Sequence, residues 1–167
     1  DEVRSGNAGQ YAVFAPVTQD QLATIEQARD THHKGLRFHY FNSEKILIVK
    51  IMLGPVEELA SKPFGSRLDV KITGMGLLDG IGRMDATTYQ RKGSQKEADC
   101  SWKPWLFSPL KTDWPTVVIE CEVSQSLGRL KADAGWWLEN SMGQVKMVLL
   151  VSFSETKREI HIEQWKM

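Results

Sequence analysis

The segment WPTVVIECEVSQSLGRLKADAGWWLEN, residues 114–140, decides the fold class. Its first half contains TVVIECEVS at 116–124, a run rich in β-branched residues that predicts a strand buried in a sheet. Its second half predicts an amphipathic helix, because apolar residues recur every three or four positions: Leu127, Leu130, Ala134, Trp137 and Leu138. A turn at residues 140–143 ends this helix. The segment therefore indicates layers of strands and helices, an α/β domain.

The remaining elements are read outward from this segment. In chain order we expect a helix at residues 18–30, a hairpin at 35–53, two consecutive helical pieces within 56–78, short strands at 86–90 and 97–102, and a hairpin at 145–165. Pro63 is the reason for dividing the long helical stretch, since proline interrupts helix hydrogen bonding. No internal repeat is present, so these elements are assigned to one domain with a mixed sheet.

Composition excludes several classes of protein. The chain has 167 residues, 41% of them hydrophobic and 25% charged, which is typical of one globular domain rather than a disordered chain. Lys and Arg number 21, as do Asp and Glu, so bulk charge favours neither nucleic acid nor an anionic membrane. The longest apolar stretch, residues 147–153, is too short to span a bilayer. With only two cysteines, an intracellular location in the cytoplasm or nucleus is expected.

Three acidic residues stand on predicted strands. Asp99 lies on one strand, and Glu120 and Glu122 share one face of another because side chains alternate with a period of two. Carboxylates that converge in a mostly apolar sheet repel one another unless a divalent cation or protonation relieves them. Oxygen ligands favour Mg²⁺ or Mn²⁺. The alternative is that these carboxylates form ordinary ion pairs with Arg67, Arg129 or Lys131.

The segments KEADCSWKP (96–104) and WPTVVIECEVSQSLGRLKADAGWWLENS (114–141) resemble the core of the PD-(D/E)XK nuclease-like superfamily, in particular a group of uncharacterised fungal proteins. The segments LIVKIM (47–52) and GQVKMVLLVSFS (143–154) extend this resemblance. It implies a restriction-endonuclease-like core, with a central mixed sheet flanked by helices, over residues 36–167. Residues 1–35 are then an N-terminal extension, partly flexible, with a short helix.

The resemblance also implies roles for individual residues. Asp99 and Glu120 match the motif aspartate and glutamate, both metal ligands, and Glu58 on the first core helix would be an additional ligand. The alternative for Glu58 is a purely structural role, because an acidic residue interacts favourably with the first turn of a helix. The chain departs from the motif at Ala98, where the superfamily has Pro, and at Glu122, where it has Lys.

The missing lysine has two candidate replacements. Lys131 or Arg129, nine to eleven residues after Glu120, would project from the following helix toward the metal. In this interpretation Asp99, Glu120 and Lys131 are catalytic and Glu122 extends the metal-binding set. Phosphate groups of the substrate would meet Arg129 and Lys103.

The implied activity is Mg²⁺- or Mn²⁺-dependent hydrolysis of phosphodiester bonds in DNA or RNA. The alternative is a nuclease fold that has lost turnover and serves as a binding or interaction module, which the neutral net charge and Glu122 favour. No membrane partner is expected. The C-terminal hairpin, together with exposed tryptophans, would form the edge of a homodimer.

Aromatic, histidine and cysteine residues each have a simple structural interpretation. Trp136 and Trp137 are expected to pack in the core, with stacking on bases as the alternative. His39 is expected to be solvated, as are the adjacent His32 and His33. Cys100 and Cys121 are expected to be buried free thiols, with a disulfide or redox pair as the alternative.

Overall fold

The computed structural model describes residues 10–33, 35–51, 55–84, 87–123, 127–154 and 157–167, and for residues 55–62 it describes only the backbone. The chain divides into two compact units. Unit 1 comprises residues 1–53 and 90–97, and unit 2 comprises residues 54–89 and 98–167. The hairpin at residues 36–51 belongs to unit 1, and the expected boundary at residue 36 stays a prediction.

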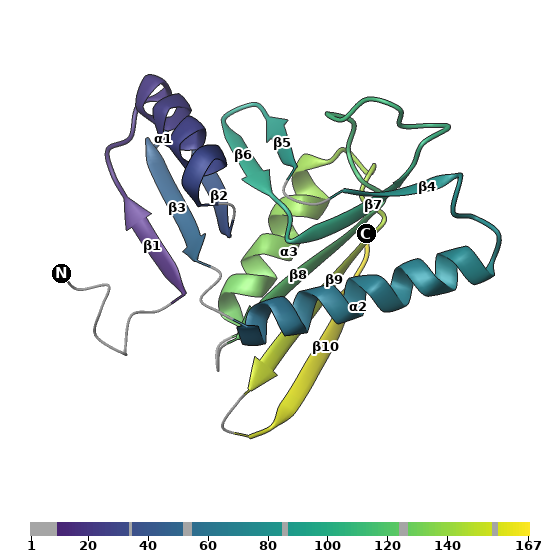
Figure 1. Cartoon of the computed structure of the whole chain (residues 1–167). Coiled ribbons are helices and arrows are strands. Elements are labelled where there is room, and N and C mark those ends of the chain that lie inside the picture. The colour runs from purple at the N-terminus through teal and green to yellow at the C-terminus, as the bar shows by residue number, and fades with distance from the viewer. Residues whose placement is uncertain (1–9, 34, 52–54, 85–86, 124–126, 155–156) are drawn as a thin grey trace. The chain divides into compact units, whose positions relative to one another are not determined.

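Unit 1 is a five-stranded sheet with one helix (Figure 1). The sheet has the order β1-β3-β2-β6-β5, with bounds Tyr11–Phe14 (β1), Leu36–Phe41 (β2), Ile46–Ile51 (β3), Thr88–Arg91 (β5) and Ser94–Glu97 (β6). The helix is α1 (Gln19–His32), and its Thr18 side chain accepts from Gln21 N in a capping box. Leu22 of α1 packs against Phe38, Tyr40 and Leu47 of the sheet, which closes a small apolar core.

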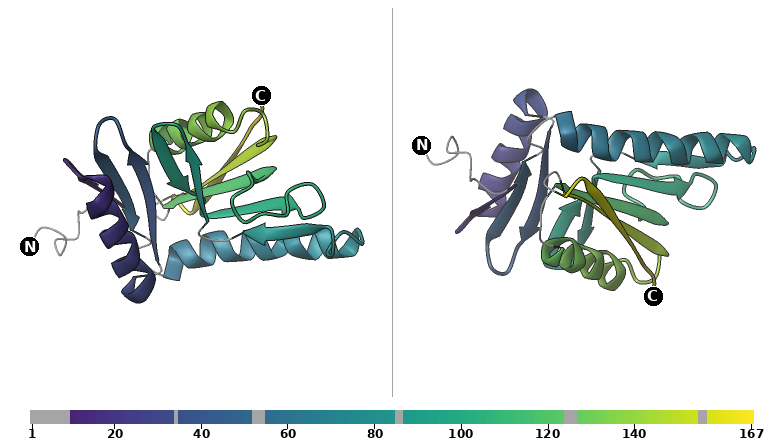
Figure 2. Two further views of the ribbon diagram at one scale, coloured as in Figure 1. Left: turned by 90° about the horizontal axis from the view of Figure 1, so that it is seen from above. Right: turned by 90° about the horizontal axis from the view of Figure 1, so that it is seen from below.

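Unit 2 holds a mixed sheet between two helices. The sheet has the order β10-β9-β8-β7-β4, with bounds Ile81–Met84 (β4), Cys100–Pro104 (β7), Val117–Val123 (β8), Met147–Ser154 (β9) and Glu159–Trp165 (β10). β8 and β9 are parallel, whereas β10 pairs with β9, β4 with β7 and β7 with β8 in antiparallel fashion. Helices α2 (Pro55–Gly74) and α3 (Gly128–Asn140) cover opposite faces of this sheet (Figure 2).

Each helix of unit 2 covers its own apolar cluster. Ile72 of α2 packs on Trp102, Ile119 and Val151. On the α3 side, Leu130, Ala134 and Trp137 pack on strand residues that include Val118, Val148 and Leu150. The strand at 117–123 is buried on both faces, which explains why its sequence is a continuous run of β-branched and apolar residues around the acidic positions.

Several sequence expectations need correction. Residues 55–74 form one continuous helix with Pro63 inside it, instead of two pieces. The cost of an interior proline, about 3 kcal/mol, is offset by packing of Phe64, Leu68 and Ile72 on the sheet. β1 and β4 were not expected, because each has only four residues and gains its stability from a neighbouring strand. The expected fraying of the first residues lies mostly outside the described part of the chain.

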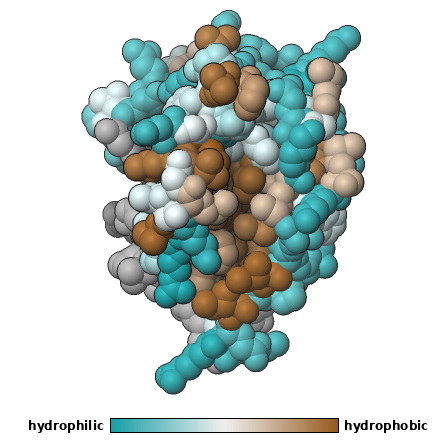
Figure 3. Space-filling model, turned by 90° about the vertical axis from the view of Figure 1, so that its right-hand side faces the viewer, coloured by the Kyte–Doolittle hydropathy of each residue, from teal (hydrophilic) through white to brown (hydrophobic). Residues whose placement is uncertain are grey.

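One end of unit 2 carries a large apolar surface (Figure 3). The loop after β7 exposes 80% of Leu106 and 81% of Phe107, and the turn after α2 exposes Met75 and Leu78. Trp105 N donates to Gly80 O at 2.9 Å, which joins the loop to that turn. Among the helices in the described part of the chain, none is long and apolar enough to cross a membrane.

Candidate active site

Glu120 lies on β8, and Asp99 lies in the bend just before the neighbouring strand β7, instead of on the strand expected at residues 97–102. β7 and β8 pair antiparallel with Cys100 opposite Ile119, so one step further along both chains Asp99 comes level with Glu120. The backbone N–H of Cys121 donates a 2.8 Å hydrogen bond to Asp99 Oδ2. This bond holds the carboxylate of Asp99 against β8.

Glu120 and Glu122 lie on the α3 side of the sheet. Their neighbours Ile119 and Cys121 belong to the apolar cluster on the α2 side, and side chains alternate along a strand. From α3, Trp137 Nε1 donates to Glu120 Oε1 at 2.6 Å. The indole therefore fixes the orientation of this carboxylate from the helix that covers it.

All three acidic side chains are withdrawn from solvent. Relative exposure is 6% for Asp99, 1% for Glu120 and 4% for Glu122. Burial of a carboxylate opposes its charged form, and neighbouring carboxylates oppose it further. This part of the sheet therefore brings three buried acidic side chains close together.

The carboxylates fit a magnesium-like ion. Mg²⁺ is usually held by one or two carboxylates and keeps several waters, and Asp99 and Glu120 supply that number. Each carboxylate has two oxygens, so one hydrogen bond from Cys121 or Trp137 does not exhaust its capacity. In the described part of the chain no group of three or more His, Cys, Asp or Glu is arranged to hold a metal. Glu58 lies in α2, within the stretch whose side chains are not described, so its expected role lies outside the described residues.

The two candidate cations on α3 are engaged with other carboxylates. Lys131 Nζ lies 3.3 Å from Glu163 Oε1 of β10. Arg129 Nη2 lies 3.1 Å from Asp133 Oδ1, one helical turn further along, and Asp133 is 1% exposed. The Lys131 side chain is 46% exposed, so its pairing with Glu163 is a weak surface interaction that costs little to break.

Comparison with known proteins decides the fold. No protein-family model matches this sequence, and no curated protein matches it. Among solved structures, a crystal structure from Anabaena variabilis, described as a "putative nuclease belonging to DUF820", matches with a TM-score of 0.59. The match covers 91% of this chain and 86% of that chain, at 13% sequence identity. The chain has a restriction-endonuclease-like fold.

This restriction-endonuclease-like fold confirms the expected α/β class with a central mixed sheet flanked by helices. The finer likeness to a group of fungal proteins, and the assignment to the PD-(D/E)XK superfamily, stay predictions. An identity of 13% establishes the fold and leaves the activity to be argued from this chain's own residues.

Lys103 has a different position from the one expected of a phosphate-binding residue. It is fully buried, and its Nζ donates to Leu110 O and, at 3.4 Å, to Asp113 O. Burial lowers the pKa of Lys103, and Asp113 opposes this effect. Lys103 therefore holds the loop after β7, and its contact with substrate phosphate stays a prediction.

Two functional contacts were missed from the sequence. Trp137 was assigned only to the core, where it is indeed fully buried, yet it also positions Glu120. Asp133 was not singled out, although it is the buried partner of Arg129. The spacing of Arg129 and Asp133, four residues apart on a predicted helix, is the signal that could have identified this pair.

The remaining residue interpretations have clear outcomes. Trp136 and Trp137 are core residues, as expected, and Cys100 and Cys121 are buried free thiols. His39 is 5% exposed and its ring lies 4.3 Å from that of Phe41, so the expectation of a solvated side chain was wrong. It lies in the middle of β2, between Ile48 of β3 and Lys96 of β6.

Proposed function

We propose that this protein is a metal-dependent nuclease that hydrolyses phosphodiester bonds of DNA or RNA. The observation that carries the proposal is the hydrogen bond from Cys121 N to Asp99 Oδ2, which brings a buried aspartate beside the buried Glu120 of the next strand. A pair of acidic side chains held in this way, on a fold like that of a nuclease, supports a site for Mg²⁺ or Mn²⁺.

The residues of the chain would divide the work as follows. Asp99 and Glu120 would hold the ion, and Glu122, two residues further on the same face, would add negative charge to the site. A bound ion would lower the pKa of its bound water and would polarise a phosphoryl oxygen as a Lewis acid. Trp137 keeps Glu120 in place while charge develops.

Charge on the phosphorane-like transition state calls for a basic residue. Glu122 occupies the position where the superfamily has lysine, so Lys131 is proposed for this role, with Arg129 as a contact for substrate phosphate. Lys131 would have to leave Glu163, and an exposed ion pair is worth only about 0–1 kcal/mol, so this exchange is energetically accessible.

Cleavage assays on single- and double-stranded DNA and RNA test the proposal. The wild type is incubated with Mg²⁺ or Mn²⁺ beside an EDTA control and an identically purified Asp99→Asn, Glu120→Gln double variant. We expect metal-dependent cleavage in the wild type and a loss of at least about a hundredfold in the double variant, because lost electrostatic stabilisation costs about 2.7–4 kcal/mol. Equal cleavage by the two proteins would show a contaminant and overturn the proposal.

A second candidate function is a nuclease-fold binding module without turnover. The pairing of Lys131 with Glu163, together with Glu122 at the lysine position, favours this candidate. It predicts no cleavage under any metal condition, with retained binding of a labelled oligonucleotide in a filter or anisotropy assay. Cleavage that depends on Asp99 and Glu120 would exclude it.

A homodimer is proposed as the assembly. β10 is an edge strand of the unit 2 sheet, and Ile160 and Ile162 on it are 63% and 51% exposed. An apolar edge strand of this kind is a template for pairing with a second chain. Of the tryptophans expected at this edge, Trp165 is partly buried, so isoleucines replace tryptophans as the proposed contacts.

A further inference from the structure

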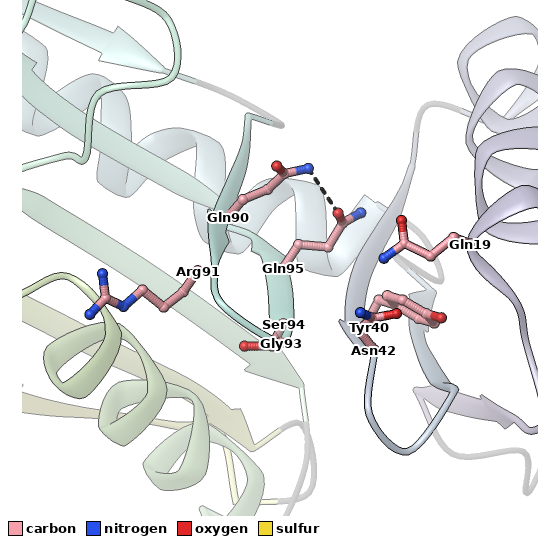
Figure 4. A pocket seen from close by; sticks show the side chains of 8 residues that line it. All are labelled: Gln19, Tyr40, Asn42, Gln90, Arg91, Gly93, Ser94 and Gln95. Atoms are coloured by element: carbon pink, nitrogen blue, oxygen red, sulfur yellow. Dashed lines mark hydrogen bonds between the residues drawn. The ribbon is translucent and has the colours of Figure 1, made fainter.

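Unit 1 contains a polar pocket of about 120 Å³ that the proposed catalytic residues do not use (Figure 4). It is lined by Gln19 of α1, by Tyr40 and Asn42 in and after β2, and by Gln90, Arg91, Gly93, Ser94 and Gln95 around the β5–β6 turn. Carboxamides thus contribute four of the eight lining side chains. Tyr40 is 1% exposed and donates its hydroxyl to Val17 O at 2.8 Å, so its position is fixed.

The carboxylate of Glu26 fixes the orientation of the Gln95 side-chain amide. Gln95 Nε2 donates to Glu26 Oε1 at 2.7 Å, and Gln95 Oε1 accepts from Gln90 Nε2 at 3.0 Å. An ionised carboxylate can only accept, so the amide nitrogen of Gln95 must face Glu26 and its oxygen must face Gln90. The amide nitrogen of Gln95 carries a second hydrogen, and in Figure 4 this nitrogen faces Gln19. The pocket therefore contains a donor whose identity is fixed.

A second group of contacts, made by Arg29, holds α1 against the sheet. Arg29 of α1 pairs with Glu97 of β6, and Glu97 Oε2 accepts from Phe38 N at 3.1 Å. Arg29 also lies over the Phe38 ring, 4.7 Å from its centroid. These contacts hold Glu26, one turn earlier on α1, in place over β6. The donor of Gln95 is consequently preorganised before any ligand arrives.

The chemistry of the lining selects an uncharged ligand rich in hydrogen-bonding groups. Arg91 is the single charged residue among the eight, and its side chain points away from the others (Figure 4). A pocket of about 120 Å³ is far larger than the space one water needs, and it leaves room for one planar heterocycle. Glutamine and asparagine carboxamides, which offer a donor and an acceptor side by side, match the edges of nucleobases.

We propose that this pocket binds a nucleobase, with Gln95 donating to a ring nitrogen or carbonyl of the base and Gln19 and Asn42 completing the contact with its edge. A base-binding pocket would let the protein engage unpaired nucleotides. The biological meaning of this pocket rests on the proposed nuclease function. Binding of the base itself requires no metal and no cleavage.

Side-chain amide signals of the ¹⁵N-labelled protein provide a direct test. The four ribonucleosides and, as a control without a base, ribose are titrated in EDTA buffer at mildly alkaline pH, because burial and the nearby Glu97 raise the pKa of Glu26. We expect saturable shifts of Gln and Asn side-chain NH₂ signals with at least one nucleoside and none with ribose. No saturable shift with any nucleoside, or equal shifts with ribose, would overturn the inference.

Variants locate the binding. Gln95→Leu removes the fixed donor and is expected to weaken nucleoside binding about fivefold or more, the loss typical of one hydrogen bond. Gln19→Leu leaves the contact between Gln95 and Glu26 intact and is expected to weaken binding by a similar factor. Lys92→Leu, at an exposed position of the same turn that does not line the pocket, is the control, and its affinity should equal that of the wild type. Unchanged affinity in both glutamine variants would place the binding elsewhere and refute the pocket.

The outcome is separable from that of the cleavage assay. Nucleosides contain no phosphodiester bond, so the Asp99→Asn, Glu120→Gln variant should bind them as the wild type does. Binding without cleavage in any metal would leave the pocket standing and remove the proposed catalysis. Cleavage without nucleoside binding would do the reverse.

Discussion

At the scale of single residues, the site depends on side chains that hold its carboxylates as much as on the carboxylates themselves. The backbone N–H of Cys121 holds Asp99, and the indole N–H of Trp137 holds Glu120. Neither donor belongs to the acidic motif. A carboxylate that is buried and oriented in advance needs no reorganisation when an ion or a substrate arrives.

Replacement of Trp137 by Phe tests this positioning role. Phe keeps a six-membered ring but loses the pyrrole ring with the N–H that donates to Glu120, so we expect the free energy of unfolding to fall by about 1–3 kcal/mol for the hydrogen bond, in addition to the cost of the smaller ring. Trp114→Phe is the control, because the Trp114 ring lies 6.0 Å from that of Trp137 in the same aromatic group, whereas the hydrogen bond to Glu120 comes from Trp137. Urea unfolding at neutral pH measures both, and an equal loss in the two variants would contradict the prediction.

At the scale of elements, α3 connects the proposed site to the C-terminal hairpin. Lys131 of α3 pairs with Glu163 of β10, and Glu163 also accepts from Trp165 Nε1 at 3.0 Å and contacts His161 Nε2 at 3.0 Å. The hydrogen bond from Trp165, followed by those from His161 and Lys131, lowers the pKa of Glu163 to about 2. Lys131, the cation proposed for catalysis, is thus paired with Glu163 of the hairpin in this structure.

The depressed pKa of Glu163 predicts a pH dependence. Because the folded-state pKa lies below the ordinary value of 4.5, the stabilisation is complete above about 4.5 and is lost as the pH falls toward about 2. An NMR titration of the Glu163 carboxyl should give a midpoint near 2. In Glu163→Gln the unfolding free energy should decline less steeply over this acid range, with at most about 1 kcal/mol lost at neutral pH because the group is partly exposed. A midpoint at the ordinary value would refute the contact.

At the scale of the whole molecule, two apolar surfaces compete as places for self-association. One is the outer side of β10 with Ile160 and Ile162, and the other is the loop after β7 with Leu106 and Phe107. Monomeric proteins seldom leave so many large apolar side chains exposed together. The β10 surface lies on an unpaired sheet edge, which the loop does not.

Sedimentation of two double variants distinguishes the surfaces. If the proposed homodimer forms through β10, Ile160→Lys with Ile162→Lys should give a monomer, and the dissociation constant should rise by at least about tenfold because charge is placed in an apolar contact. Leu106→Lys with Phe107→Lys is the matched control and should stay dimeric. A monomeric control beside a dimeric β10 variant would assign the interface to the loop and reject the β10 dimer.

The local sequence determined a large part of the architecture. The run at 116–124 and the periodic helix after it predicted β8 and α3, because burial on both faces and amphipathic spacing leave patterns that need no neighbours to interpret. Thr18, a residue type that caps helices, likewise marked the start of the predicted helix, and the structure gives it a capping box. Asp99 and Glu120 stood out because acidic residues interrupt predicted apolar strands.

Only the tertiary structure decided how those residues are used. Three features depend on partners distant in sequence. They are the single helix that contains Pro63, the sheet that residues 36–51 and 90–97 form with β1, and the burial of Lys103. The same holds for Trp137 and Glu120, and for Gln95 between Glu26 and Gln90. The residue type determines how many hydrogen bonds a side chain can make. Packing between elements determines which atoms make them, and the local periodicity of the sequence does not predict that packing.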